Sequence, residues 1–444
     1  MMNILIVTTY FPPDTTIASV RPYMFARYLS ENGHGVTVLR SGEFQNAPFD
    51  EYTDDERFEV ISVLGKNSPA EKYKRNEYEG FAPAPARKGQ KLPRRLRIPI
   101  KAIRDSAWVI AEKPPRCIRR ECRVLKYHQK AIDRLYGLGR RYDVVFSTCG
   151  DLENIYAGKY AAEKFGAKWI MDFRDSMIFK GSMYEDFWWN RYAKDATLRA
   201  LKEADCVTAV SYALADELRE LYPPANIRVL HNGYDDTETV PETETDPDVL
   251  TMCYTGRIYD DRKPALEALA VCIAKLIADN KADRNRIRIK YAGAGTEAFE
   301  EIFKAHGIAD VLDNKGYLSK HDTFRLQLES DLFIVLSWNT KQSKGILTGK
   351  FYEGIKAGKP ILSLLTGNAP DSELMQLQRE YDYGFCYEHI NRKAMMPELE
   401  KYIEGLYREK ISCGKLSYKP KQELCDAFGY TRLSEDLLGI MEGL

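Results

Sequence analysis

The chain has 444 residues, 44% of them hydrophobic, and its 65 Lys and Arg residues balance its 65 Asp and Glu residues. This length predicts two or three domains with a sizeable core, and the balanced charge excludes nucleic acid as a partner. Nine cysteines without paired spacing, no signal peptide before Ile4 and no apolar run of membrane-spanning length predict a cytoplasmic protein, at most peripheral to a membrane.

Short β-branched runs alternate with helical patterns through the first half of the chain. Apolar residues recur at helical spacing from Ser19 to Leu29, and Asn32 with Gly33 ends that helix. The alternation predicts a doubly wound parallel sheet. Its predicted strands are Ile4–Thr8, Val36–Leu39, Val144–Ser147, Trp169–Phe173, Cys206–Ser211 and Ile227–Leu230.

A basic insertion, about residues 66–130, interrupts this alternation. Between Arg87 and Lys126 it holds fourteen Lys and Arg residues against three acids, interleaved with apolar residues. Such a segment can lie on anionic lipid at the inner face of the plasma membrane. The alternative is a solvated insertion whose cations pair with the acids of residues 50–56.

An acidic, proline-bearing stretch at residues 240–248 predicts an interdomain linker, after which the alternation restarts. Two such units joined by a hinge would face a central cleft, with ligands at the carboxyl ends of the strands. A last helical pattern runs from Glu423 to Leu444. The predicted strands of the second unit are Met252–Thr255, Ile287–Ala292, Leu332–Leu336 and Pro360–Leu365.

The segment from Gly345 to Leu365 is the most informative about function. Gly349 opens a short helix, and Glu353 lies one turn inside it. The helix N-terminus favours phosphate, Lys350 adds a mobile cation, and Glu353 can accept hydrogen bonds from ribose hydroxyls. The segment therefore predicts a nucleotide diphosphate site. The alternative is that Gly349 and Gly358 only mark the ends of a helix and that Glu353 is a solvated surface acid.

Charged and polar residues also follow other predicted strands. Arg257, with Arg262 and Lys263 near a predicted helix start, suits a diphosphate or a solvated turn. The cluster Asp172–Asp175 fits either a buried mutual ion pair or a substrate contact. Asn232, which follows the strand predicted at Ile227–Leu230, is a further candidate substrate-binding residue; the alternative is that its Asn-Gly pair is typical of any turn.

Eight segments carry these features in sequence order. They are ILIVTTYFPPDTTIASVRPYMFARYLSENGHGVTVL, KWIMDFRDS, EADCVTAVSYALADEL, VLHNGYDD, YTGRIYDDRKPALEAL, YAGAG, NKGYLSKHDTFRLQLESDLFIVLS and TGKFYEGIKAGKPILSLL. The series resembles the GT-B glycosyltransferases, and within them the retaining, family 4-like group that uses nucleotide sugars to build bacterial surface polysaccharides.

The resemblance implies an α/β fold of GT-B architecture, with two Rossmann-like doubly wound domains. Residues 1–240 would form the acceptor domain and residues 250–425 the nucleotide-sugar donor domain. Residues 426–444 would form a helix that returns to the first domain and makes it discontinuous.

The resemblance also implies how the donor is held. Arg257 binds the diphosphate together with Arg262, or with Lys263 as the competing choice. Glu353 holds the ribose, and the loop at Thr348 and Gly349 offers backbone N–H groups to the phosphates.

Two further groups of residues follow from the resemblance. The base is gripped by the turn Gly316, Tyr317 and Leu318. The acceptor side, near the transferred sugar, is bordered by Asp172, Arg174 and Asp175.

The chain departs from the family pattern at two places. Gly345 stands eight residues before Glu353, where the family often has a first glutamate, so the donor sugar must be held by other groups such as the backbone of residues 344–346. Ala18 and Ser19 stand where many members have Gly-Gly; they permit close approach to phosphate but lack glycine's freedom at positive φ.

These features predict a retaining, metal-independent glycosyltransferase of the hexosyltransferase type that needs no cofactor. Arg257, with Arg262 or Lys263, would stabilise the leaving diphosphate in place of a divalent metal ion. No His, Asp or Glu cluster in the sequence has the spacing of metal ligands. The donor would be a nucleotide diphosphate sugar and the acceptor a glycan or a lipid-linked molecule. The alternatives are a GT-B nucleotide-sugar epimerase and a catalytically silent glycan-binding or scaffold protein.

Overall fold

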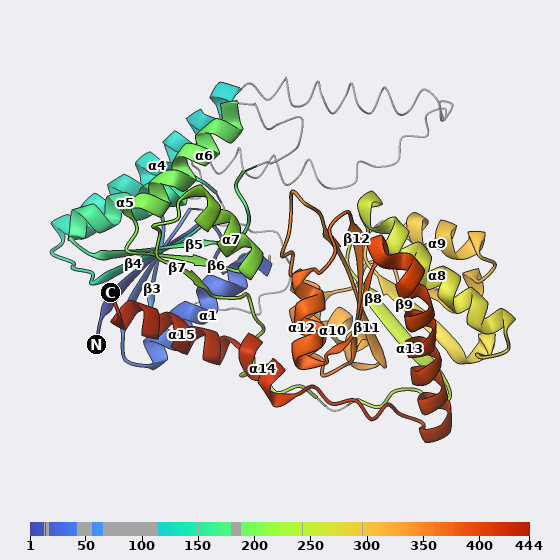
Figure 1. Ribbon diagram of the computed structural model, residues 1–444. Helices are drawn as coiled ribbons and strands as arrows, with labels where there is room; N and C mark the ends of the chain where they lie inside the picture. Colours follow the sequence, from blue (N-terminus) through green and yellow to red (C-terminus); the bar gives the residue numbers. More distant parts are fainter. Residues whose placement is uncertain are drawn as a thin grey trace, which may run out of the picture. The chain divides into compact units, whose positions relative to one another are not determined.

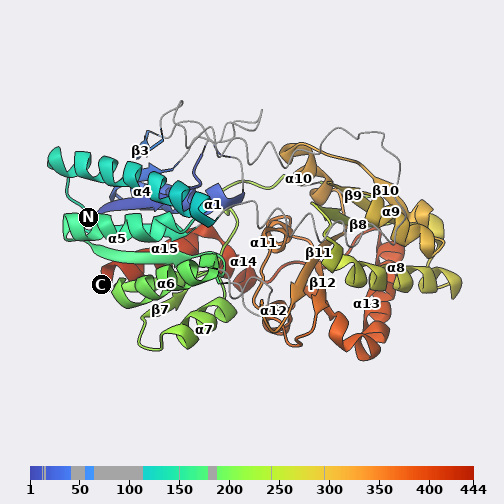
Figure 2. The same ribbon diagram turned by 90° about the horizontal axis from the view of Figure 1, so that it is seen from above.

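The computed structural model describes residues 1–12, 14, 17–41, 56–64, 114–149, 151–178, 188–241, 243–294 and 296–444. It divides into two compact units, each with one parallel β-sheet and helices on both faces (Figures 1 and 2). The first unit comprises Met1–Val210, Glu217–Val229 and Leu437–Leu444, and the second comprises Ser211–Asp216 and Leu230–Asp436. Most of the predicted basic insertion, residues 66–113, lies outside the described residues.

The sheet of the first unit has the strand order β3-β2-β1-β4-β5-β6-β7, and all its pairs are parallel. Every strand predicted for this half is confirmed to within two residues; β3 escaped prediction because it is a short, half-buried edge strand without an apolar run. The strands are β1 (Asn3–Thr8), β2 (Gly35–Arg40), β3 (Glu59–Ser62), β4 (Val144–Cys149), β5 (Lys168–Phe173), β6 (Cys206–Ala209) and β7 (Ile227–Val229).

Helices cover this sheet from both sides, with α1 and α5 on opposite faces (Figure 1). The helix predicted between Ser19 and Leu29 is confirmed as α1, and Gly166 ends α5 in the left-handed conformation that glycine adopts without strain. The helices are α1 (Ile17–Glu31), α4 (Pro114–Gly137), α5 (Glu153–Phe165), α6 (Trp188–Glu203) and α7 (Tyr212–Leu221).

The sheet of the second unit repeats this topology, with the order β10-β9-β8-β11-β12-β13 and parallel pairing throughout. Its four predicted strands are confirmed to within three residues. The strands are β8 (Leu250–Thr255), β9 (Ile287–Ala292), β10 (Leu312–Asn314), β11 (Leu332–Asn339), β12 (Ile361–Gly367) and β13 (Gly384–Glu388).

Helices α8 and α9 cover one face of the second sheet and α12 the other (Figure 1). The single helix predicted near the C-terminus is two helices, because Gly429 adopts extended backbone between α14 and α15. The helical segments are η1 (Asp260–Arg262), α8 (Lys263–Ala278), η2 (Arg284–Arg286), α9 (Thr296–Ala305), η3 (Ala309–Val311), α10 (Lys320–Leu328), α11 (Gly349–Lys356), α12 (Glu373–Tyr381), η4 (His389–Asn391), α13 (Arg392–Cys413), α14 (Gln422–Phe428) and α15 (Tyr430–Glu442).

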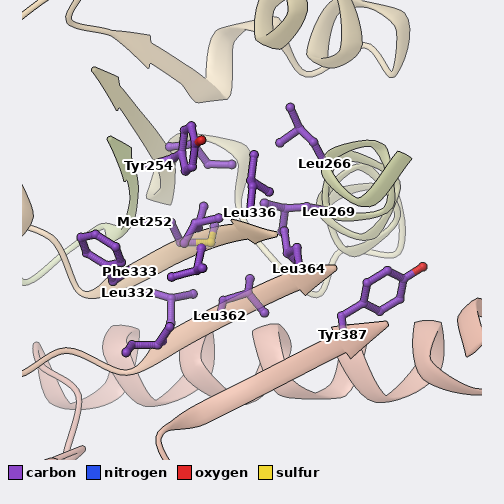
Figure 3. Packing of buried hydrophobic residues seen from close by; sticks show 14 of the residues in the cluster. Met252, Tyr254, Leu266, Leu269, Leu332, Phe333, Leu336, Leu362, Leu364 and Tyr387 are labelled. Carbon is purple, nitrogen blue, oxygen red and sulfur yellow. The ribbon is translucent and has the colours of Figure 1, made fainter. Parts of the chain in front are cut away.

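The core of the second unit is a continuous apolar layer on the central strands (Figure 3). Met252, Phe333 and Leu364, from three neighbouring strands, are fully buried, as is Leu269 from α8. Each such side chain contributes about 1.5–3 kcal/mol on burial. The packed strands give a rigid support for the loops at their carboxyl ends.

Two further observations concern the whole described chain. Within its described part, none of the helices combines the length and apolar character that spanning a bilayer requires. The compact units divide between Val229 and Leu230, upstream of the predicted linker at residues 240–248, and the last eight residues group with the first unit.

A buried ion pair ties the linker to the core of the second unit. Lys410 of α13 donates to Asp331 Oδ1 (2.7 Å) and to Thr245 Oγ1 (2.6 Å), and the other oxygen of Asp331 accepts from the N–H of Thr251 (2.9 Å). The side chains of Lys410 and Asp331 are 0% and 3% exposed, so each depends on the other for compensation of its charge.

Replacing Lys410 with Met leaves the Asp331 carboxylate buried and unpaired. We expect Lys410→Met to lower the free energy of unfolding by about 3–5 kcal/mol, measured by urea unfolding. Lys401→Met, at an exposed position of the same helix, is the control and should change it by less than about 0.5 kcal/mol. Equal stability of the two variants would contradict this prediction.

Candidate functional site

The carboxyl end of β8 carries a loop whose backbone is held tightly. Gly256 has φ +132° and Gly293, after β9, has φ +155°, and a Cβ atom on Gly293 would lie 2.0 Å from the carbonyl oxygen of Gly256. The hydroxyl of Tyr254 donates to the carbonyl of Arg257 (2.9 Å), and that of Tyr291 donates to the carbonyl of Gly256 (3.1 Å). Arg257 is therefore presented on a fixed loop, with its side chain exposed.

Arg262, at the end of η1, is oriented by aromatic rings. Its guanidinium lies 4.6 Å from the ring centroid of Tyr259 and 4.9 Å from that of Trp338, and its buried Nε has no hydrogen-bond partner among the described residues. Lys263 instead forms an ion pair with Asp260 (2.8 Å). The geometry therefore favours Arg262 over Lys263 as the second cation for a diphosphate.

Helix α11 begins without a side-chain cap. Its N-cap residue, Thr348, has extended backbone (φ −71°, ψ 154°), and its hydroxyl makes no capping bond and has no partner within the described part of the chain. The first N–H groups of the helix, beginning at Gly349, therefore keep their capacity to bind an anion, and the helix dipole adds to it.

Glu353 lies one turn inside α11 and is held by two donors. Lys350 Nζ is 2.8 Å from both carboxylate oxygens, and Gln327 Nε2 donates to Oε2 (2.7 Å). The Glu353 side chain keeps 29% exposure, so it can still accept bonds from a ligand. Gly256 lies beside this pair, because a Cβ there would be 3.2 Å from Lys350 Cε.

The predicted base-binding turn lies at the same edge of the sheet. Gly316 has φ +66°, and its carbonyl accepts from the N–H of Gly293 (2.9 Å). Leu318 packs on the core, whereas Tyr317 is 88% exposed. The turn is thus anchored on both sides and presents one free aromatic ring.

These contacts bring most of the predicted donor residues to one edge of the second sheet. Arg257 and Arg262 follow β8, and Lys350 and Glu353 follow β11, the two strands at which the strand order reverses. The described residues contain no group of three or more His, Cys, Asp or Glu side chains able to hold a metal ion.

In the first unit, Asp172 forms a buried ion pair with Arg21. The guanidinium donates through Nη2 to Oδ1 (2.8 Å) and through Nε to Oδ2 (3.1 Å), and the hydroxyls of Thr208 (2.7 Å) and Thr148 (2.8 Å) complete the set. Asp172 is 0% exposed. Of the two alternatives for this acid, the structure matches the buried ion pair, with Arg21 rather than Arg174 as the partner.

The other predicted residues of the first unit lie beyond the carboxyl end of β5 and at the start of α1. Arg174 Nη1 donates to the carbonyl of Ala18 (2.5 Å), and Asp175 is exposed. Ser19 is fully buried, and its hydroxyl donates to the carbonyl of Asp14 (2.5 Å). Arg174, Asp175 and Ala18 therefore keep access to solvent, and Ser19 does not.

The structure explains why Gly345 occupies the position of the expected first glutamate. Its φ is +67°, and a Cβ there would lie 2.8 Å from Oε2 of Glu373, which belongs to the same compact unit. Glu373 is buried and accepts from the N–H groups of Tyr212 (3.0 Å) and Ala213 (3.2 Å), residues of that unit too; burial raises its pKa to about 7. A side chain at position 345 would require this arrangement to move.

Asn232 belongs to a segment that pairs with the returning C-terminal chain. The N–H of Tyr234 donates to the carbonyl of Phe428 (3.0 Å), and a Cβ on Gly233 would lie 2.4 Å from that carbonyl oxygen. The Asn-Gly pair therefore permits a close approach of two chain segments. Its contacts do not include Arg257 or Glu353 among the described residues.

Sequence reasoning missed two residues of the donor site. Gln327 contacts Glu353, and Trp338 contacts Arg262. The sequence does contain a signal for Gln327, because it is a polar residue directly between two leucines, Leu326 and Leu328, on α10. Trp338 stands at a strand end without a charge or motif, and nothing in the sequence distinguishes it.

Similar solved structures define the fold of this protein. Sucrose-phosphate synthase from Thermosynechococcus elongatus matches with 12% identity and a TM-score of 0.61, covering 100% of this chain and 99% of that chain. Anabaena Alr3699/HepE in complex with UDP-glucose (14%, 0.55) and the lipopolysaccharide outer core galactosyltransferase WaaB (11%, 0.54) each match over 100% of both chains. The fold is therefore GT-B, as the sequence predicts.

The family follows from a separate comparison. A family model described as Glycosyltransferase Family 4 matches residues 18–238. Together with the GT-B fold, this match shows that the chain belongs to the family 4-like glycosyltransferases. No curated protein sequence matches the chain.

The Asp172 ion pair makes a pH-dependent contribution to stability. Burial raises the pKa of Asp172, but Arg21, Thr208 and Thr148 outweigh burial and hold the pKa below its ordinary value of 3.8. A carboxyl group whose pKa is depressed on folding stabilises the protein above its unfolded pKa, and this contribution disappears as the pH falls through the folded pKa.

We therefore expect Asp172→Asn to lower the free energy of unfolding by about 3–5 kcal/mol at pH 7, because Arg21 loses its counter-charge. The difference from the wild type should begin to shrink below about pH 4, where Asp172 of the unfolded wild-type chain takes up a proton, and it should be lost once the pH falls through the lower folded pKa. Urea unfolding at pH 7 and pH 3 measures both quantities. Asp175→Asn, at an exposed site, is the control; a loss for Asp172→Asn that does not depend on pH would refute the ion-pair explanation.

Proposed function

We propose that this protein is a retaining, metal-independent hexosyltransferase that moves a sugar from a nucleoside diphosphate sugar to a glycan or lipid-linked acceptor in surface polysaccharide synthesis. One observation carries the proposal. At the carboxyl edge of the second sheet, two arginines follow β8, and the uncapped start of α11, with Lys350 and Glu353, follows the neighbouring strand β11. Cations and free N–H groups suit a diphosphate, and the carboxylate suits ribose hydroxyls.

The same groups supply what the chemistry requires. As the bond between the sugar and the diphosphate breaks, negative charge grows on the leaving phosphate oxygen, and Arg257, Arg262 and the N–H groups of Gly349 and Lys350 stabilise it. The acceptor hydroxyl attacks from the same face of the sugar and loses its proton to the departing diphosphate. The guanidinium charges take the role of a divalent cation, so chelators should leave the reaction intact.

In the first unit, we assign the residues beside the transferred sugar as Arg174, Asp175 and the backbone of Ala18. Asp172 acts through Arg21 as a positioning residue, because the carboxylate is fully buried and its acceptors are occupied. Ser19 holds the start of α1 through Asp14.

The similar proteins support a UDP-hexose donor and a surface acceptor. One of them is in complex with UDP-glucose, and another is a galactosyltransferase of the lipopolysaccharide outer core. The basic segment at residues 87–126 supports a peripheral contact with anionic membrane at the cytoplasmic face, where a lipid-linked acceptor is met. An epimerase would require acid and base groups on both faces of the sugar, and a scaffold would bind no nucleotide.

Nucleotide binding is the first test. We expect one of UDP, GDP and ADP, with UDP favoured, to raise the midpoint of thermal unfolding by several degrees at 1 mM, because a ligand that binds only the folded state stabilises it. Product analysis with the matching sugar nucleotide then separates transfer from epimerisation. If none of the three nucleotides changes the midpoint, the donor-site assignment is wrong and the scaffold function is favoured.

The role of the two arginines in phosphate binding can be tested by comparing UDP with uridine. We expect Arg257→Ala and Arg262→Ala each to weaken UDP binding by about 10–100-fold, the effect of losing a charge-assisted hydrogen bond to phosphate, and to weaken uridine binding little. Isothermal titration calorimetry measures both ligands. Arg408→Ala, at an exposed position of α13, is the matched control. Equal losses for UDP and uridine would argue against a phosphate role.

A further inference from the structure

Gln327 is a buried polar side chain at the donor site. It lies on α10 and is 1% exposed, between the buried residues Leu326 and Leu328. Its Nε2 donates to Oε2 of Glu353 (2.7 Å) and to Oγ1 of Thr255 (2.9 Å), the last residue of β8. Burying an amide is unfavourable unless it is hydrogen-bonded, so these two bonds fix the side chain.

The orientation of the amide follows from its partner. A carboxylate can only accept, so the nitrogen of Gln327 must face Glu353. Both N–H bonds of that nitrogen are then used, one on Glu353 and one on the rigid strand end at Thr255. Gln327 therefore connects the Glu353 carboxylate to the sheet.

Lys350, the other partner of Glu353, is held less firmly. Its side chain is 30% exposed and four methylenes long, and its ammonium lies beside the start of α11, where we place the diphosphate. If Lys350 turned to a phosphate, Oε1 of Glu353 would lose the Lys350 donor and Oε2 would keep Gln327.

We propose that Gln327 is a positioning residue for ribose recognition. This inference rests on the proposed function. Gln327 holds Oε2 of Glu353 against the sheet, so that Oε1 faces the ribose 2′- and 3′-hydroxyls while Lys350 serves the diphosphate. The discrimination between ribose and deoxyribose then depends on a residue that does not touch the ligand.

The test compares UDP, GDP and ADP with their 2′,3′-dideoxy forms by isothermal titration calorimetry. We expect the wild type to bind one ribonucleotide about tenfold more tightly than its dideoxy form. Gln327→Met should weaken the ribonucleotide about tenfold and leave the dideoxy form unchanged, which removes the discrimination. Gln376→Met, the same substitution at an exposed position of α12, is the control and should behave as the wild type.

A second substitution at position 327 keeps the test decisive if Gln327→Met does not fold. Gln327→Leu also removes the donor to Glu353 and differs from Met in shape, so it should lose the discrimination as well; thermal unfolding checks that each variant is folded. A folded variant that still prefers the ribonucleotide tenfold overturns the inference and leaves the proposed function standing. A wild type that binds none of the nucleotides overturns both.

Discussion

The donor site depends on the close approach of two backbone segments, at Gly256 and Gly293. No side chain fits at Gly293, because even a Cβ atom would collide with the carbonyl of Gly256. Gly293 also donates to the carbonyl of Gly316, which connects the loop after β8 to that turn. The hydroxyls of Tyr254 and Tyr291 hold the loop by hydrogen bonds to the carbonyls of Arg257 and Gly256. Charged side chains on such a loop need little reorganisation to meet an anion, which is the condition for strong electrostatic stabilisation.

Much of the fold could be predicted from the sequence, because both sheets are parallel and buried. The central strands are continuous apolar runs such as Leu332–Leu336, and turn residues mark their ends. The strands that were missed, β3, β10 and β13, are at or next to a sheet edge and carry polar or aromatic residues without an apolar run. The C-terminal pattern predicts one helix because its spacing continues across Gly429, whose extended backbone is set by the packing of residues 234–236.

The site was less predictable, since a motif identifies a residue but not its partners. Glu353 and Arg262 could be chosen from their spacing, yet the aromatic ring of Trp338 and the amide of Gln327 are brought to them by tertiary structure. Asp172 shows the converse. Its sequence neighbours are charged, which favours pairing with Arg174, but strand alternation turns it inward to Arg21, 151 residues away. Gly345 likewise reflects crowding by Glu373 that no local pattern reveals.

The ion pair of Lys350 with Glu353 has a consequence for how tightly any donor can be held. In the ligand-free protein the ammonium and the carboxylate neutralise each other, so a guest must compete with an existing bond and only the difference between two interactions contributes to affinity. A molecule with phosphate alone would leave the acid with the neutral Gln327 amide but without its counter-charge, and a sugar alone would have to share the acid with Lys350. The pair therefore favours ligands that carry both a phosphate and a sugar, and it disfavours free inorganic anions and free sugars.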